Sequence, residues 1–158
     1  MIYETKQFQL KISEAVNNIF LQYRQLKEQD TEAGGVLLGR FLQESNNVVI
    51  DQITVPMEND TRTRFFYKKY REDHQAIVDK FWAETEGTCN YLGEWYTHPE
   101  QNPTPSAHDR NEWSKILRHT VCDSDILFFI IVGTKSMGVW IGYRDDQLIE
   151  KLIKAKLR

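Results

Sequence analysis

The residues best suited to chemistry lie in the segment GEWYTHPEQNPTPSAHD, residues 93–109. If its first part is a strand, the side chains of Tyr96 and His98 share one face, and two ligands at that spacing could hold one metal ion. Ser106 and Asp109 form an S-x-x-D pattern where the next helix should begin, and the helix dipole favours a carboxylate there. Folding the proline-punctuated loop back would bring Asp109 near His98, so the segment indicates a candidate metal site.

A carboxylate far upstream is a further candidate for this chemistry. Glu32 stands immediately before the glycine-rich strand AGGVLLGRF and has no evident cationic partner in the neighbouring sequence. Such a group can act as a general base toward a metal-bound water. Taken singly, a histidine before a proline suits a turn, an S-x-x-D pattern suits a capping box, and a glutamate suits the surface. Their joint order and spacing favour a catalytic site.

Hydrophobic periodicity predicts the elements that must position these residues. The predicted helices span residues 14–29, 71–85, 107–119 and 146–157. The predicted strands span residues 8–12, 34–42, 46–55, 90–98, 125–133 and 138–144. Residues 56–70 are polar and are predicted to form a long loop. Because hairpin-connected strands mix with helices without strict alternation, the sequence predicts an α+β fold with helices packed on a largely antiparallel sheet.

The bulk properties fit one globular domain over residues 1–158. The chain is 41% hydrophobic and 27% charged with a formal net charge of -3, and it forms no broad basic patch, so nucleic acid is not an expected partner. No apolar run approaches the roughly 20 residues of a membrane span, and the N-terminus lacks the order of a signal peptide, so we expect a cytoplasmic protein without a membrane partner. Cys89 and Cys122 lack CxxC spacing and are expected to be reduced.

Glu32 before the glycine-rich strand, then GEWYTHP, then PTPSAHD, resemble the JAMM (Jab/MPN/Mov34) zinc metallopeptidases, particularly their short bacterial members. The family pattern is an upstream glutamate, followed by His-x-His-Pro and then by Pro-Ser-x-x-Asp. Here Glu32, His98, Ser106 and Asp109 fall in place, and residues 99–108 separate the histidine from the aspartate. The resemblance spans nearly the whole chain and implies a JAMM/MPN-like fold with a curved, largely antiparallel sheet.

The resemblance also implies roles for these residues. One zinc ion per chain would be held by two histidines and one aspartate, with the fourth position left to water. His98 and Asp109 would be metal ligands. Glu32 would accept the proton of the bound water and relay it to the leaving amine, and Ser106 would help to stabilise the oxyanion by hydrogen bonding.

Candidate substrate-binding residues lie in the long loop and beside the histidine. In the family resemblance, loops such as residues 56–67 border a groove in which an extended peptide tail adds as a strand. Phe65 and Phe66 lie in this loop, and Trp95 flanks the site. We therefore expect these aromatic side chains to contact a substrate.

The sequence departs from the family at Tyr96, because EWYTHP stands where EWHTHP is expected. A phenol titrates near about pH 10 and must lose its proton before it binds zinc well, so tyrosine is a poorer ligand than imidazole. Three interpretations are open: an introduced substitution that disarms the enzyme, a natural relative that binds without hydrolysis, and an active variant in which Tyr96 or a neighbour such as His108 completes the shell. His108 should point about 100° away from Asp109 around the helix, so we do not expect it to coordinate the same ion.

The implied activity is that of a zinc-dependent, deubiquitinase-like isopeptidase or peptidase. It would remove a ubiquitin-like or similarly C-terminally conjugated protein from its target. Small bacterial members of this kind resemble partners of E1- and E2-like ligases, including those in antiphage operons. Two alternatives are open: a non-catalytic module that binds the same extended C-terminal tail without zinc, and a hydrolase of amide-linked small molecules.

Overall fold

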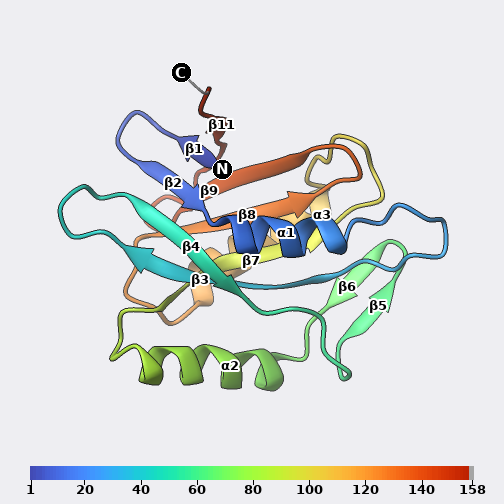
Figure 1. Cartoon of the computed structure of the whole chain (residues 1–158), viewed down its shortest axis with the longest axis horizontal. Helices are drawn as coiled ribbons and strands as arrows, with labels where there is room; N and C mark the ends of the chain where they lie inside the picture. The colour runs from blue at the N-terminus through green and yellow to red at the C-terminus, as the bar shows by residue number, and fades with distance from the viewer. Residues whose placement is uncertain (157–158) are drawn as a thin grey trace.

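The computed structural model describes residues 1–156, in which three helices accompany one large sheet and a separate hairpin (Figure 1). The helices are α1 (Glu14–Gln22), α2 (Arg71–Glu84) and α3 (Ala107–His119). The strands of the large sheet are β1 (Ile2–Glu4), β2 (Gln9–Ile12), β3 (Gly34–Phe41), β4 (Val48–Ile53), β7 (Asn90–Thr97), β8 (Ile126–Val132), β9 (Met137–Tyr143), β10 (Ile149–Lys151) and β11 (Ile153–Lys154). The hairpin consists of β5 (Thr61–Thr63) and β6 (Phe66–Lys68). None of the three helices among residues 1–156 has the length and apolar composition of a membrane span.

The sheet is mostly antiparallel and strongly curved. Its strand order within residues 1–156 is β10-β9-β8-β7-β3-β4-β2-β1-β11. The pairs β2–β4 and β7–β8 are parallel, and the other neighbours are antiparallel. The predicted α+β class with a curved, largely antiparallel sheet is therefore confirmed, and the central strands β3 and β7 lie side by side.

The end of the chain forms strands, so the predicted helix over residues 146–157 is wrong across its described part; Leu157 lies outside the described residues. β10 pairs with β9 and β11 pairs with β1, so this segment joins the two ends of the strand order. The amide of Leu152 donates to the carbonyl of Val139 (2.8 Å), and the amide of Ala155 donates to the carbonyl of Ile2 (2.8 Å). Pairing with β9 and with β1 gives the backbone of this segment hydrogen-bond partners and buries Leu152. These tertiary contacts therefore override the local helical pattern.

Two other predicted segments differ from the structure in extent. α1 ends at Gln22 rather than near Asp30, and the next apolar side chain, Leu26, is 60% exposed, so a longer helix would have little to bury. The predicted loop over 56–70 contains the hairpin β5–β6, in which Thr63 pairs with Phe66 across a two-residue turn. Threonine and aromatic residues favour strands, and they outweigh the polar character of the segment.

The two faces of β7 carry separate cores. On one face Trp95 packs on Phe20 of α1, with ring centroids 5.0 Å apart. On the other face Trp113 of α3 stacks on Phe129 of β8, with ring centroids 4.7 Å apart. Because alternate residues of a strand face opposite ways, Tyr96 lies on the α3 side, 6.3 Å from Trp113 between ring centroids. α1 and α3 therefore cover opposite faces of the strand that leads to His98 (Figure 1).

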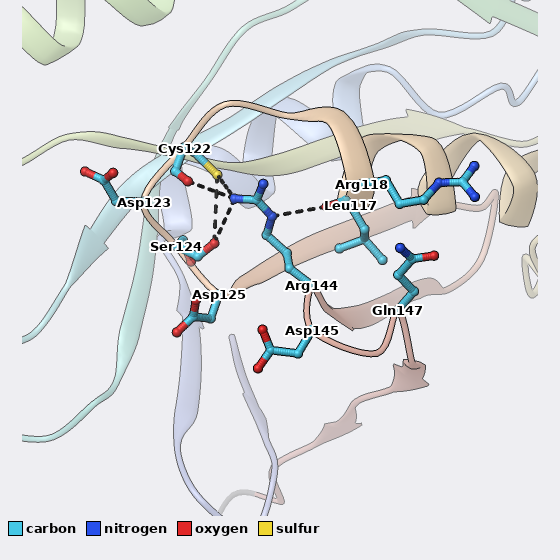
Figure 2. Close-up of a pocket in the computed structure, with 9 residues that line it drawn as sticks. All are labelled: Leu117, Arg118, Cys122, Asp123, Ser124, Asp125, Arg144, Asp145 and Gln147. Carbon is cyan, nitrogen blue, oxygen red and sulfur yellow. Dashed lines mark hydrogen bonds between the residues drawn. The ribbon is translucent and has the colours of Figure 1, made fainter.

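Arg144 fixes the C-terminal end of α3 from the end of β9 (Figure 2). Its Nε donates to the carbonyl of Leu117 (3.1 Å), and its Nη1 donates to those of Cys122 (2.8 Å) and Ser124 (3.1 Å). These residues line a pocket of about 330 Å³ at the C-terminal end of α3, and none of the predicted site residues lines it. Because the guanidinium is engaged by carbonyls at the end of the helix, we interpret this pocket as structural.

Candidate active site

The candidate site forms where β7 ends beside the start of β3. Gly34 pairs with Tyr96, so the residues before β3 lie next to the residues after β7. A Cβ on Gly34 would lie 2.6 Å from the ring of Tyr67, so only glycine allows this close packing. The pairing brings Glu32 and His98 to the same end of the strand pair.

His98 and Asp109 are brought together from two different elements. The Nε2 atom of His98 lies 3.4 Å from Oδ2 of Asp109. Asp109 is held by the capping box of α3, in which the amide of Ser106 donates to Asp109 Oδ2 (2.8 Å) and the amide of Asp109 donates to Ser106 Oγ (3.1 Å). On the other side of the ring, Nδ1 of His98 lies 2.7 Å from Oε1 of Glu100. His98 is thus fixed from both sides, with Nε2 directed at the carboxylate.

The loop between His98 and α3 is folded back by the turn between β8 and β9. The amide of Thr134 donates to the carbonyl of Glu100 (2.7 Å), and the amide of Ser136 donates to the carbonyl of Gln101 (2.9 Å). The hydroxyl of Ser136 also donates to the side-chain oxygen of Asn102 (2.8 Å). These contacts provide the fold-back that the proximity of His98 and Asp109 requires.

Glu32 is a buried carboxyl group, only 6% exposed. Burial raises its pKa from 4.5 to about 7, while the charge of His98 lowers it and that of Asp109 raises it. The three groups therefore interact electrostatically. A carboxyl group with a pKa near neutrality can both accept and return a proton at physiological pH.

His98 and Asp109 form a polarised pair. Burial lowers the pKa of His98, but its hydrogen bonds to Asp109 and Glu100 outweigh this and leave the pKa above its usual value. Burial raises the pKa of Asp109, but the hydrogen bonds from His98 and Ser106 outweigh this and leave the pKa below its usual value. Asp109 is therefore ionised at neutral pH, as a metal ligand or a proton-orienting group requires.

Tyr96 is the unsatisfied member of the site. Its ring centroid lies 5.5 Å from that of His98, and its buried hydroxyl has no hydrogen-bond partner among residues 1–156. Burial comes first among the causes that raise the pKa of Tyr96 well above its usual value of 10. The Asp109 carboxylate adds to it through its charge and by facing the hydroxyl without meeting hydrogen-bond geometry, and the charge of Glu32 adds less. The hydroxyl is therefore neutral at physiological pH and a weak donor to a metal ion.

A family described as prokaryotic homologs of the JAB domain matches residues 18–144. The chain belongs to this family. The JAB assignment confirms the resemblance to bacterial JAMM-type proteins that the order of Glu32, His98 and Asp109 predicts.

Two of the proteins to which the JAB domain is similar carry the same name. A protein of Pseudomonas aeruginosa named CD-NTase/cGAS isopeptidase is 39% identical over 107 residues, which cover 68% of this chain and 66% of that protein. A protein of the same name from Vibrio cholerae is 36% identical over 129 residues, which cover 82% of this chain and 78% of that protein. A solution structure of a Desulfitobacterium hafniense protein has a TM-score of 0.60 at 16% identity, covering 90% of this chain and 88% of that chain, and supports the fold alone.

The residues present do not complete the zinc shell that the JAMM resemblance implies. Within residues 1–156, no group of three or more His, Cys, Asp or Glu side chains could hold a metal ion. His98 and Asp109 supply two donors, and Tyr96 presents a neutral phenol in the third position. A zinc site with three protein ligands and an open fourth position therefore does not fit this side-chain set.

The remaining predicted residues lie in different environments. Phe65 and Phe66 are 75% and 40% exposed on the hairpin β5–β6. Trp95 is 1% exposed, and its indole nitrogen donates to the carbonyl of Thr54 (2.9 Å), so in this structure it has no surface to offer a substrate. His108 is exposed, whereas Asp109 is half-buried beside His98. The exposure of His108 agrees with a surface position, and its direction relative to the site stays a prediction.

Sequence reasoning missed Glu100, which holds the second ring nitrogen of His98. The available signal was an acidic residue two positions after a candidate ligand histidine. Metal-bound histidines usually donate their other nitrogen to such a carboxylate. We interpret Glu100 as the group that sets the orientation of the His98 ring.

Proposed function

We propose that this JAB domain is an isopeptidase-type hydrolase for proteins conjugated through their C-terminus, and that Tyr96 blocks hydrolysis in the present sequence. The observation that carries the proposal is that His98 and Asp109 lie 3.4 Å apart, interact electrostatically with the buried Glu32, and lie beside Tyr96, whose hydroxyl has no hydrogen-bond partner among the described residues. The name isopeptidase, carried by the Pseudomonas and Vibrio relatives, supports the reaction class. A histidine at position 96 would supply the donor that the site lacks.

Two side chains of the site, Glu32 and Ser106, suit roles in amide hydrolysis that a complete ligand set would allow. Glu32, with a pKa of about 7, would take the proton of an attacking water and return it to the leaving amine. The Oγ of Ser106 accepts a hydrogen bond from the amide of Asp109. The hydroxyl hydrogen of Ser106 is therefore free to donate to the oxyanion formed from the scissile carbonyl. Both roles depend on the ordered water that a complete metal shell would hold.

The proposed substrate is a folded protein with an extended C-terminal tail. The hairpin β5–β6 has exposed aromatic residues at Phe65 and Phe66 and can accept a tail as an added strand. The relatives' name points to a CD-NTase as one such protein. We further propose that the domain acts in the cytoplasm. It would work with an E1- and E2-like conjugation system of an antiphage operon and would remove a conjugated ubiquitin-like protein or CD-NTase from its target.

A second candidate function is a binding module that grips the tail without cutting it. The absence of a three-donor metal group within residues 1–156 favours this reading. The two functions differ in what a histidine at position 96 would do. An enzyme inactivated by Tyr96 gains hydrolytic activity from that single change, whereas a dedicated binding module does not.

The test is cleavage by Tyr96→His, with Tyr96→Phe as the matched control that removes the hydroxyl without adding a donor. The substrates are ubiquitin and a CD-NTase, each joined through its C-terminal residue to a lysine of a carrier protein. We expect Tyr96→His to release the carrier from at least one conjugate when zinc is supplied, and the parent and Tyr96→Phe to bind without turnover. No release by Tyr96→His, with tail binding retained, would favour the binding module.

A further inference from the structure

A buried amide outside the predicted site connects three segments around it. Gln25, which follows α1, is 2% exposed. Its Nε2 donates to the carbonyls of Arg64 (2.8 Å) and Asp30 (3.2 Å). Its Oε1 accepts a hydrogen bond from the hydroxyl of Thr97 (2.8 Å). Arg64 is the first residue of the hairpin turn, so one side chain joins the hairpin β5–β6 to the end of β7.

Thr97 carries this link into the site. It stands between Tyr96 and His98 and has no exposed surface (0%). The Oγ1 of Thr97 also accepts a hydrogen bond from the amide of Ala33 (2.9 Å), and the amide of Thr97 donates to the carbonyl of Ala33 (2.9 Å). Because Ala33 directly follows Glu32, the Thr97 hydroxyl ties the histidine strand to the segment that carries the buried carboxyl group.

The hairpin closes the network from its other side. The amide of Glu32 donates to the carbonyl of Thr63 (2.7 Å), and Nε of Arg62 donates to the carbonyl of Glu32 (2.8 Å). The hairpin, Glu32 and His98 are thus linked through buried or half-buried hydrogen bonds, while Phe65 projects outward. A shift of the hairpin would break several of these bonds together.

The chemistry of position 25 requires a side chain that donates and accepts at once without a charge. A primary amide has both functions, whereas glutamate lacks the donor and lysine lacks the acceptor. An apolar side chain of similar length would fill the space but leave the carbonyls of Arg64 and Asp30 without this donor. Buried carbonyl groups without partners are costly, so the contact selects glutamine.

We propose that Gln25 is a positioning residue that holds the hairpin β5–β6 in register with Glu32 and His98. Docking of a C-terminal tail on the hairpin and the geometry of the site are then set by one buried amide. The role of the hairpin in tail docking rests on the proposed function. The coupling between hairpin and site rests on the hydrogen bonds alone.

Hydrogen exchange tests the coupling without any substrate. We compare the parent with Gln25→Met, which keeps the length and removes both hydrogen-bonding functions, and with Thr97→Ser, which keeps the hydroxyl. The control is Thr85→Val, which removes the side-chain hydrogen bonds to Phe81 O (2.8 Å) and Cys89 N (2.9 Å) before the far end of β7. Loss of the Gln25 link should speed exchange of the Glu32 and Ala33 amides about five- to tenfold.

The conservative variant and the control make the result specific. Thr97→Ser should keep the exchange rates of both amides within about twofold of the parent, because the hydroxyl is retained. Thr85→Val should leave them unchanged. Parent-like exchange in Gln25→Met, or equal acceleration in Thr85→Val, would overturn the proposal.

Tail binding separates this inference from the proposed function. The probes are fluorescein-labelled peptides carrying the C-terminal tails of ubiquitin and of a CD-NTase. If the parent binds either tail, Gln25→Met should weaken it about fivefold or more while Thr85→Val does not, and equal affinity in Gln25→Met and parent would contradict the inference. If the parent binds neither, the proposed function fails, and the exchange result alone decides the role of Gln25.

Discussion

Two clusters in this JAB domain combine histidine, aspartate and tyrosine, and they differ in whether their hydrogen bonds are complete. The interior cluster contains Thr54, Asp60, Tyr67 and His74. The site cluster contains Glu32, Tyr96, His98, Ser106 and Asp109. The same residue types thus occur in two settings within one fold.

The interior cluster is closed. Nδ1 of His74 lies 2.6 Å from the Thr54 hydroxyl, and Nε2 lies 2.8 Å from Asp60 Oδ2. The Tyr67 hydroxyl donates to the same carboxylate at 2.8 Å, and the side chains of His74 and Asp60 are 1% and 0% exposed. Its polar atoms bond to one another and join α2 and the hairpin to Thr54, the residue after β4, so we interpret the cluster as structural.

The site cluster is open. The side chains of His98 and Asp109 are 14% and 13% exposed, and their closest approach is 3.4 Å. The Tyr96 hydroxyl has no partner within the described residues. The difference shows that histidine and aspartate alone do not mark a functional site. The incomplete set of partners close to solvent is the feature on which we base the proposal of a site at His98 and Asp109.

The largest expected effect separates the two clusters by stability. Asp60 accepts hydrogen bonds from Tyr67 and from the amides of Met57 and Tyr70, and it pairs with His74. Asp60→Ala should therefore destabilise the fold by about 3 to 5 kcal/mol, because four donors, three of them in part-buried hydrogen bonds, lose their acceptor. His98→Ala should cost less than about 1 kcal/mol. Urea unfolding measures both, and similar losses in the two variants would remove the distinction.

A smaller effect of opposite sign is expected at Glu32. Its folded pKa of about 7 exceeds the ordinary 4.5, so the folded state binds its proton more tightly than the unfolded state. The favourable contribution is present below pH 4.5 and is lost as the pH rises to about 7. Glu32→Gln, which is always neutral, should exceed the parent in stability by about 1 to 2 kcal/mol at pH 8, allowing for solvent screening, and lose this advantage near pH 4. Urea unfolding across this pH range tests the sign, and a pH-independent difference would contradict the buried, protonated carboxyl group.

The smallest effect compares the two tyrosines by the same substitution. Tyr67→Phe removes a hydroxyl that donates to Asp60, so it should cost about 1 to 2 kcal/mol. Tyr96→Phe removes a buried hydroxyl without a partner, so it should be neutral or stabilise the fold by up to about 1 kcal/mol. The two free energies of unfolding are measured in the same buffer. A loss at Tyr96 as large as that at Tyr67 would mean that its hydroxyl is satisfied.

Local chemistry was predictable where neighbouring residues determine the structure. The S-x-x-D pattern at Ser106 predicted the start of α3, because a capping box involves only residues three positions apart. The order of Glu32, His98 and Asp109 predicted the family, because their types and spacing are properties of the sequence itself. Neither result required knowledge of the packing of the sheet.

Other features were not predictable because distant segments create them. The segment around Leu152 has a helical pattern, but its backbone pairs with β9 on one side and β1 on the other. The bonds of Gln25 join residues separated by 39 and 72 positions, so nothing near position 25 indicates them. The departure at Tyr96 was visible in the sequence, whereas the burial of its hydroxyl required the packing of Trp113 and His98.

The most direct test of the central claim is zinc per chain, measured by elemental analysis on the parent and on Tyr96→His, both purified without chelator. If position 96 is the missing donor, Tyr96→His should hold about one zinc ion per chain and the parent almost none. Equal zinc in the parent and in Tyr96→His, whether about one per chain or none, would contradict the claim that this residue separates the present site from a complete one.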